Sequence, residues 1–195
     1  MKKQTVTLLS LTAVLLLSIV LLSGCGSSRQ AGFEEVRNVP DWVLNSPQSE
    51  DAFYGIGIAQ KTNPALGQQA ADSRARDAIV RTIKLEIGNL LRDSMGEVLT
   101  TLGTEGREYT ESVSEQVGSM SLRGAVIEKR EVHGKTWYSL ARINIAKVRE
   151  NILETARTQA RRDEAMYQKF LAEQSFDRLG QKVNDLKGST STVDE

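Results

Sequence analysis

Cysteine, histidine and aromatic residues are scarce in this sequence. Its 195 residues include one cysteine and one histidine, and 5% of them are aromatic. A single cysteine excludes an intrachain disulfide and, once modified, leaves no thiol for a metal site. Stability must therefore come from packing, and we expect a small and mostly aliphatic core.

An excess of either charge is also absent. The chain carries 25 basic and 25 acidic residues. Without the first 24 residues, which include two lysines, 23 basic residues face 25 acidic ones, and the net charge is −2. This balance favours neither nucleic acid as a partner nor a polybasic membrane surface.

Sequence motifs of common enzymes are missing as well. Neither Gly-x-Ser-x-Gly nor His-Glu-x-x-His occurs. His133 falls in a predicted turn, where a solvated histidine is more common than a catalytic base. Gly55 and Gly57 resemble the start of a dinucleotide-binding loop, but Gln60 takes the place of its third glycine. We expect a protein that is not an enzyme and holds no cofactor or metal; a carboxylate pair among its many acidic residues stays open as an alternative.

The N-terminal segment has the pattern of a secretory signal peptide over residues 1–24. Two lysines at positions 2 and 3 precede an apolar run over residues 8–22, which ends in Leu22-Ser23-Gly24-Cys25. A positive start, a short apolar core and small residues at the cut site are typical of such peptides. The run is shorter than the roughly 20 residues of a membrane span, which favours cleavage over an uncleaved helix.

The motif Leu22-Ser23-Gly24-Cys25 resembles the lipobox of bacterial lipoproteins. The resemblance implies cleavage before Cys25, diacylglycerol on its sulfur and a further acyl chain, such as palmitate, on its amino group. Several chains hold a protein on a membrane firmly, because each buried methylene contributes about 0.8 kcal/mol. By analogy with lipoprotein sorting, Gly26 in place of aspartate favours the outer membrane, and we expect the protein to face the periplasm.

The remaining chain is predicted to have four parts. Residues 25–38 are small and polar, as in a flexible lipidated tether. Residues 39–152 are predicted to form an α+β domain, residues 153–187 a C-terminal helical extension and residues 188–195 a disordered tail. Trp42 is expected to anchor the start of the domain by packing, and a contact with a partner is the alternative.

The predicted domain has a small three-stranded sheet in the order strand, helix, hairpin, helix. Residues 52–59 alternate as a strand, with the small residues Gly55, Gly57 and Ala59 on one face, where a helix can approach closely. That helix begins at Asn63-Pro64 and ends near residue 95 or residue 102. Its inward stripe comprises Ala71, Ala75, Ile79, Ile83, Ile87 and Leu91.

The second half of the domain is predicted to contain a polar segment without a clear pattern, a hairpin and the start of a helix. Residues 103–121 are polar and rich in glycine and serine, which indicates either a mobile loop or partner surface, or a solvated connector. Val113 and Val117 are four apart, so a short helix within this segment is also possible. Residues 122–132 and 136–145 alternate on either side of His133-Gly134-Lys135, which predicts a hairpin. A long C-terminal helix is expected from residue 146.

An apolar stripe marks the C-terminal extension. Its members are Phe176, Leu179, Val183 and Leu186, spaced as in a coiled-coil seam for under two heptads. If exposed, the stripe is a candidate partner surface, which would join copies of the protein or bind another envelope protein. A helix folded back on its own domain is the alternative.

The order of several motifs resembles the bacterial twenty-kilodalton lipoprotein family. The motifs are Pro40-Asp41-Trp42-Val43, the strand over residues 54–59, the alanine- and arginine-rich helix over residues 71–78, and Trp137-Tyr138. The resemblance covers residues 39–152 and implies a structural lipoprotein of the cell envelope, with flagellum-associated relatives and no catalytic residues. A carrier of lipid or peptide is the first alternative, and an envelope hydrolase is the second.

Overall fold

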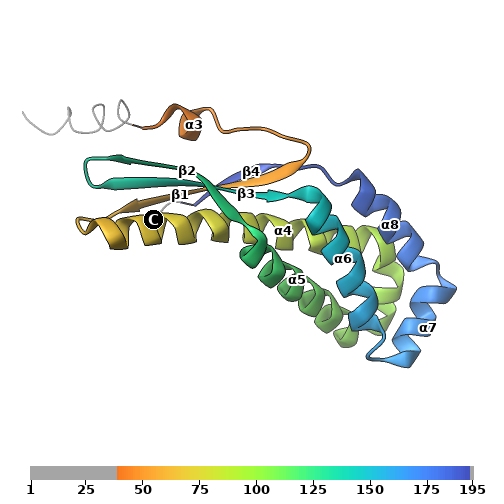
Figure 1. The fold of residues 1–195 in the computed structure, drawn as a ribbon. Helices are drawn as coiled ribbons and strands as arrows, with labels where there is room; N and C mark the ends of the chain where they lie inside the picture. Colours follow the sequence, from red (N-terminus) through yellow and green to blue (C-terminus); the bar gives the residue numbers. More distant parts are fainter. Residues whose placement is uncertain (1–38, 194–195) are drawn as a thin grey trace, which may run out of the picture. The chain divides into compact units, whose positions relative to one another are not determined.

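The computed structural model describes residues 39–193, and Pro40 begins one compact unit. The elements follow in the order α3 (Asp41–Leu44), β1 (Ala52–Gln60), α4 (Pro64–Leu102), α5 (Thr104–Gly124), β2 (Val126–His133), β3 (Thr136–Asn144), α6 (Ile145–Ala160), α7 (Glu164–Ala172), α8 (Ser175–Asp185) and β4 (Thr190–Val193) (Figure 1). The predicted α+β class is confirmed, whereas the predicted count of three strands is wrong.

The sheet has four strands in the order β2-β3-β1-β4. The predicted hairpin is present as β2 and β3, and β3 pairs antiparallel with β1. The fourth strand, β4, runs parallel to β1 and pairs Thr190 with Tyr54. Residues 190–193 are therefore a strand and not part of a disordered tail, because their Thr and Val side chains suit a pleated edge.

Helix α4 lies directly against β1, as the small-residue face predicts. A Cβ atom on Gly57 would overlap the carbonyl oxygen of Ala71 and the amide nitrogen of Ala75. One on Gly55 would overlap the carbonyl oxygen of Ala75. The two backbones touch here, so the predicted close contact of this helix with the strand is confirmed.

The start of α4 follows the predicted capping pattern. The Asn63 side chain accepts a hydrogen bond from the amide of Leu66 at 3.2 Å, and Pro64 occupies the first helical position. All six residues of the predicted inward stripe are buried. The backbone leaves helical geometry at Met95, with φ −142° and ψ 21°, before the helix resumes to Leu102. Both predicted end points thus mark real features of one long helix.

Residues 103–121, predicted as a loop or connector, are almost wholly helical. Helix α5 buries Tyr109, Val113 and Val117 in the common core. These residues are four apart, which places them on one face of a helix. The surrounding glycine and serine residues dilute this pattern in the sequence, which explains why the loop prediction is wrong.

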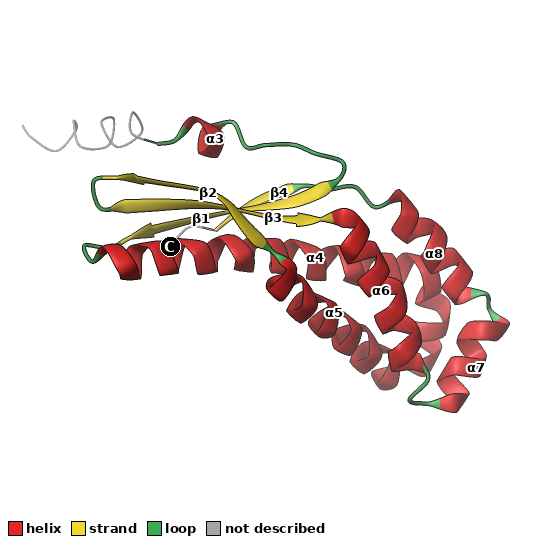
Figure 2. Cartoon of the chain, in the orientation of Figure 1, coloured by secondary structure: helices red, strands yellow, loops and turns green. Residues whose placement is uncertain are grey.

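The C-terminal region consists of three helices, not one long helix. The chain turns after Ala160 and again near Gln174, whose φ of 52° is left-handed and ends regular helix. Figure 2 shows α6, α7 and α8 as separate helices: α7 and α8 contact α4, whereas α6 packs against α5 and α8. Helix α6 continues through residue 152, where the predicted domain ends and the predicted extension begins. Residues on both sides of this predicted boundary belong to one hydrophobic core.

Candidate functional site

The predicted lipidation site lies outside the described residues. This holds for Cys25 and for the lipobox residues Leu22, Ser23 and Gly24, and equally for the signal peptide and residues 25–38. Lipid attachment therefore stays a prediction from the sequence. Within residues 39–193, no helix is both long and apolar enough to cross a membrane.

The predicted partner surface on the C-terminal extension is not an exposed stripe. The exposed fractions are 6% for Phe176, 0% for Leu179, 0% for Val183 and 8% for Leu186. All four residues belong to the hydrophobic core of the domain. The expectation of an exposed stripe is therefore wrong, and the alternative of a helix folded back on its own domain is correct.

An aromatic cluster explains why α8 folds back. The Phe176 ring lies 5.6 Å from Phe170, and Phe170 lies 5.1 Å from Tyr109 on α5. The Tyr109 hydroxyl donates a hydrogen bond to the carbonyl oxygen of Ala156 at 2.9 Å, and burial raises the pKa of this phenol. Aromatic pairs at such distances stabilise beyond the area they bury. Helices α5 to α8 are thereby joined around one centre.

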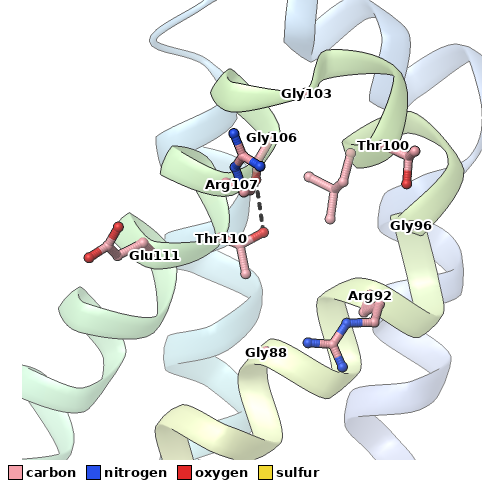
Figure 3. Close-up of a pocket in the computed structure, with 10 residues that line it drawn as sticks. Gly88, Arg92, Gly96, Thr100, Gly103, Gly106, Arg107, Thr110 and Glu111 are labelled. Carbon is pink, nitrogen blue, oxygen red and sulfur yellow. Dashed lines mark hydrogen bonds between the residues drawn. The ribbon is translucent and has the colours of Figure 1, made fainter.

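A surface hollow between α4 and α5 is the candidate binding site. Its volume is about 610 Å³, within the range of small-molecule pockets. Residues from the end of α4, the turn and the start of α5 line it (Figure 3): Gly88, Arg92, Gly96, Leu99, Thr100, Gly103, Gly106, Arg107, Thr110 and Glu111.

Glycines keep part of this hollow open. A Cβ atom on Gly88 would have no neighbouring heavy atom within 4 Å, and one on Gly96 would meet only Cγ of Arg92 at 3.9 Å. The helices touch at Gly106 instead, where a Cβ atom would overlap the carbonyl oxygen of Leu99. The hollow therefore lies beside a close contact between α4 and α5.

Arg178 on α8 fixes the bend of α4 beside this hollow. Its Nε donates a hydrogen bond to the carbonyl oxygen of Ser94 at 2.8 Å, one residue before the non-helical Met95. The same guanidinium also donates to the carbonyl oxygen of Glu173 and, at 3.4 Å, to the hydroxyl of Ser175. A planar group with several donors can hold such separate acceptors in one geometry.

Two arginines stand on the two helices that form the hollow. Arg92 donates to the side-chain oxygen of Asn89 at 3.3 Å, and Arg107 donates to the hydroxyl of Thr104 at 3.2 Å. Both acceptors are uncharged. Figure 3 shows Arg92 on α4, Arg107 on α5 and the Glu111 carboxylate directed away from the space between them. With two arginines and one glutamate in its lining, the hollow carries a net charge of +1.

A separate polar cluster joins α4 to the sheet. Asp72 accepts hydrogen bonds from Ser139 at 2.6 Å and from two nitrogens of Arg130 at 2.9 Å. Burial alone would raise the pKa of Asp72, but the bonds from Arg130 and Ser139 and the charge of Arg76 hold it below its ordinary value. Because the Asp72 carboxylate already accepts hydrogen bonds from both Arg130 and Ser139, the cluster has the character of a structural tie between α4 and the sheet.

The only histidine has the structural surroundings of a turn residue. His133 lies 3.3 Å from a carboxylate oxygen of Glu131 and packs its ring edge-on against Tyr138 at 5.8 Å. The other carboxylate oxygen of Glu131 accepts a hydrogen bond from the Trp42 indole. Trp42 thereby links α3 to β2 by a hydrogen bond. Its side chain is only half-buried and α3 has no buried residue, so the predicted anchoring by packing is not confirmed.

No group of three or more His, Cys, Asp and Glu residues in the described part of the chain could hold a metal ion. Comparisons with protein-family models, curated proteins and solved structures find no match for this chain. The family resemblance therefore stays a prediction from the sequence motifs.

Sequence reasoning missed the hollow. The available signal was the series Gly88, Gly96, Gly103 and Gly106, which interrupts two otherwise regular helical patterns. Each interior glycine costs a helix roughly 1 kcal/mol relative to alanine. Such a series indicates a local reason for small residues, but it does not distinguish a close helix contact from an open space.

Proposed function

We propose that this chain is a lipid-anchored protein of the outer membrane with a structural or assembly role in the cell envelope. The observation that carries the proposal is the motif Leu22-Ser23-Gly24-Cys25 behind a basic and apolar leader. Acyl chains on Cys25 would attach the protein to the membrane. Its partners would be other copies or other envelope proteins, including those of a flagellum.

The length of chain between the anchor and the folded unit supports this proposal. Fourteen residues, 26–39, separate Cys25 from Pro40, where the compact unit begins. Fully extended, they reach at most about 50 Å at roughly 3.4 Å per residue. The domain would therefore stay within one or two domain diameters of the membrane surface.

The packing of the domain also favours a structural role. The backbones of β1 and α4 touch at Gly55 and Gly57, so this contact leaves no space for a ligand between strand and helix. Helix α8 is fixed to α4 through Arg178 and to α7 through the aromatic cluster. A domain closed in this way presents fixed surfaces to a partner.

A carrier of small molecules is the second candidate function. The hollow between α4 and α5 favours it, because about 610 Å³ of space is bordered by two arginines. This candidate is compatible with lipid anchoring, since the hollow lies within the folded unit.

Acyl labelling of a cysteine variant tests the proposed anchor. We expect the full chain to incorporate a palmitate analogue and to sediment with outer membranes, whereas Cys25→Ser accumulates as an unlabelled precursor. Ser28→Ala is the matched control, because it changes a neighbouring small residue and leaves the lipobox intact. Labelling or processing of Cys25→Ser at the level of the unchanged chain would contradict the anchor.

The assembly role needs a separate measurement. The anchored protein, solubilised in mild detergent, is expected to show a native mass above that of one chain or to capture envelope proteins that Cys25→Ser does not. A monomeric mass without captured envelope proteins would favour the carrier.

A further inference from the structure

We propose that the hollow between α4 and α5 binds a small organic anion. Its acidic group, a phosphate or carboxylate, lies between Arg92 and Arg107, and its apolar body lies against Leu99. This site goes beyond the proposed anchoring and structural role, and it does not depend on lipid attachment.

The charges on the two walls are the first support. Within the described residues, Arg92 and Arg107 each donate to an uncharged oxygen, so their ion pairing is left to another group. Both arginines are exposed, so solvent screens their mutual repulsion, and an anion between them would be attracted to each. A guanidinium presents paired donors that match the oxygens of a phosphate or carboxylate.

The shape and lining of the hollow indicate a ligand with an apolar part. Gly88 and Gly96 offer backbone carbon without side chains, and Leu99 lines the same space. The Thr110 hydroxyl already donates to the carbonyl oxygen of Gly106 at 2.9 Å, so its proton is not available to a ligand. The acidic group must therefore obtain its hydrogen bonds mainly from the arginines.

The hollow is also held in shape before any ligand arrives. Its α4 wall includes the segment that follows Met95. Arg178 on α8 donates a hydrogen bond to the carbonyl oxygen of Ser94, the residue before Met95. A preformed site loses less conformational freedom on binding than a flexible one. The hydrogen bond from Arg178 distinguishes the hollow from a gap between two loosely attached helices.

Equilibrium dialysis with labelled phenyl phosphate tests the site on the full chain in phosphatidylcholine nanodiscs. Phenyl phosphate supplies both an acidic group and an apolar ring and stays in water. We expect saturable binding with one site per chain. Inorganic phosphate, which lacks the apolar body, is expected to bind at least several-fold more weakly, and benzyl alcohol, which lacks the charge, is expected not to compete.

Variants of Arg92, Arg107 and Gly88, which all line the hollow, locate the binding. Arg92→Gln and Arg107→Gln should each weaken phenyl phosphate binding about tenfold, since each removes a charged hydrogen-bond donor. Gly88→Leu should abolish binding without unfolding, because its side chain enters open space. Arg81→Gln is the matched control, an exposed arginine of α4 that does not line the hollow.

Three results would overturn the proposal. The first is the absence of saturable phenyl phosphate binding. The second is an equal loss of binding in Arg81→Gln and Arg92→Gln, which would indicate attraction by overall charge. The third is full binding by a Gly88→Leu protein whose melting temperature shows it to be folded. If inorganic phosphate binds as tightly as phenyl phosphate, the apolar part of the proposal is wrong.

Discussion

Arg178 and Ser94 join two helices that are 84 residues apart in the sequence. The Arg178 Nε donates to the carbonyl oxygen of Ser94 at 2.8 Å, immediately before α4 departs from helical geometry at Met95. Arg178 therefore links the bend of α4 to α8, which the aromatic cluster and the core residues of α8 also hold in place. Helix α8 acts as a brace for the end of α4 that borders the hollow.

The brace predicts a clear loss of stability when Arg178 is shortened. Arg178→Ala should lower the free energy of unfolding by about 2–3 kcal/mol, because it removes a charged hydrogen bond to the partly buried carbonyl of Ser94 and one to the exposed carbonyl of Glu173. Urea denaturation followed by circular dichroism measures this change. Lys182→Ala, an exposed cation on the same helix, should change it by less than about 0.5 kcal/mol. Equal effects of the two variants would show that the brace contributes nothing.

Glycine-to-alanine substitutions should have opposite effects at two positions. Gly57→Ala places a Cβ atom on the backbone of α4 and should destabilise the domain by about 3 kcal/mol or more. Gly88→Ala adds a Cβ atom in open space and should stabilise α4 by about 0.5–1 kcal/mol. Melting temperatures of the two variants test this, and a neutral Gly57→Ala would contradict the close contact of strand and helix.

The buried stripe predicts a core effect at Leu179. Leu179 has an exposed fraction of 0%, so Leu179→Ala should cost about 2–5 kcal/mol through lost burial and an unfilled cavity. Leu171→Ala is the control, since Leu171 on α7 is 45% exposed and should cost less than about 1 kcal/mol. Chemical denaturation compares them. A folded Leu179→Ala protein with altered native mass but unchanged stability would restore the partner-surface interpretation.

The Asp72 tie predicts a dependence of stability on pH. Because the folded-state pKa of Asp72 lies below its ordinary value near 3.8, its stabilisation is complete above that value and is lost as the pH falls through the folded pKa. Asp72→Asn should therefore cost about 1–2 kcal/mol at pH 7, a value that allows for the exposure of Arg130. The difference from the unchanged chain should shrink below about pH 4.

A matched variant separates this tie from general charge effects. Asp77→Asn removes an exposed carboxylate from the same helix, where the Ser73 hydroxyl lies 3.5 Å away. Denaturation curves from pH 2 to pH 7 should diverge between the two variants only above about pH 4. Parallel curves would show that Asp72 stabilises no more than an ordinary surface carboxylate.

The first half of the domain could be predicted because several local signals agree. Asn63-Pro64 carries both a capping side chain and a favoured first residue, and the alternation in β1 separates glycines from larger residues. Gly134 adopts a φ of 63° in the predicted hairpin turn. Each of these signals acts within a few residues, so the sequence alone contains enough information.

The C-terminal half depends on contacts that sequence periodicity does not report. The same stripe containing Leu179 suits an exposed seam and a buried face, and only the positions of Phe170 and Tyr109 decide between them. β4 likewise needs the edge of β1, which is more than 130 residues away. The bend at Met95, which Gly96 follows directly, matches a predicted end point, but the hollow also depends on how α5 packs against α4.

The pairing of β1 also has a consequence for how this chain folds. Tyr54 pairs with Arg142 and Thr190, separations of 88 and 136 residues, whereas α4 and α5 are joined by a single residue. Closing long loops is slow relative to forming local helical contacts. We expect the α4–α5 hairpin to form early while β1, with its run of apolar residues, waits unpaired for partners that arrive late. The interval before they arrive is when the chain is most open to aggregation and when binding by a chaperone would protect it most.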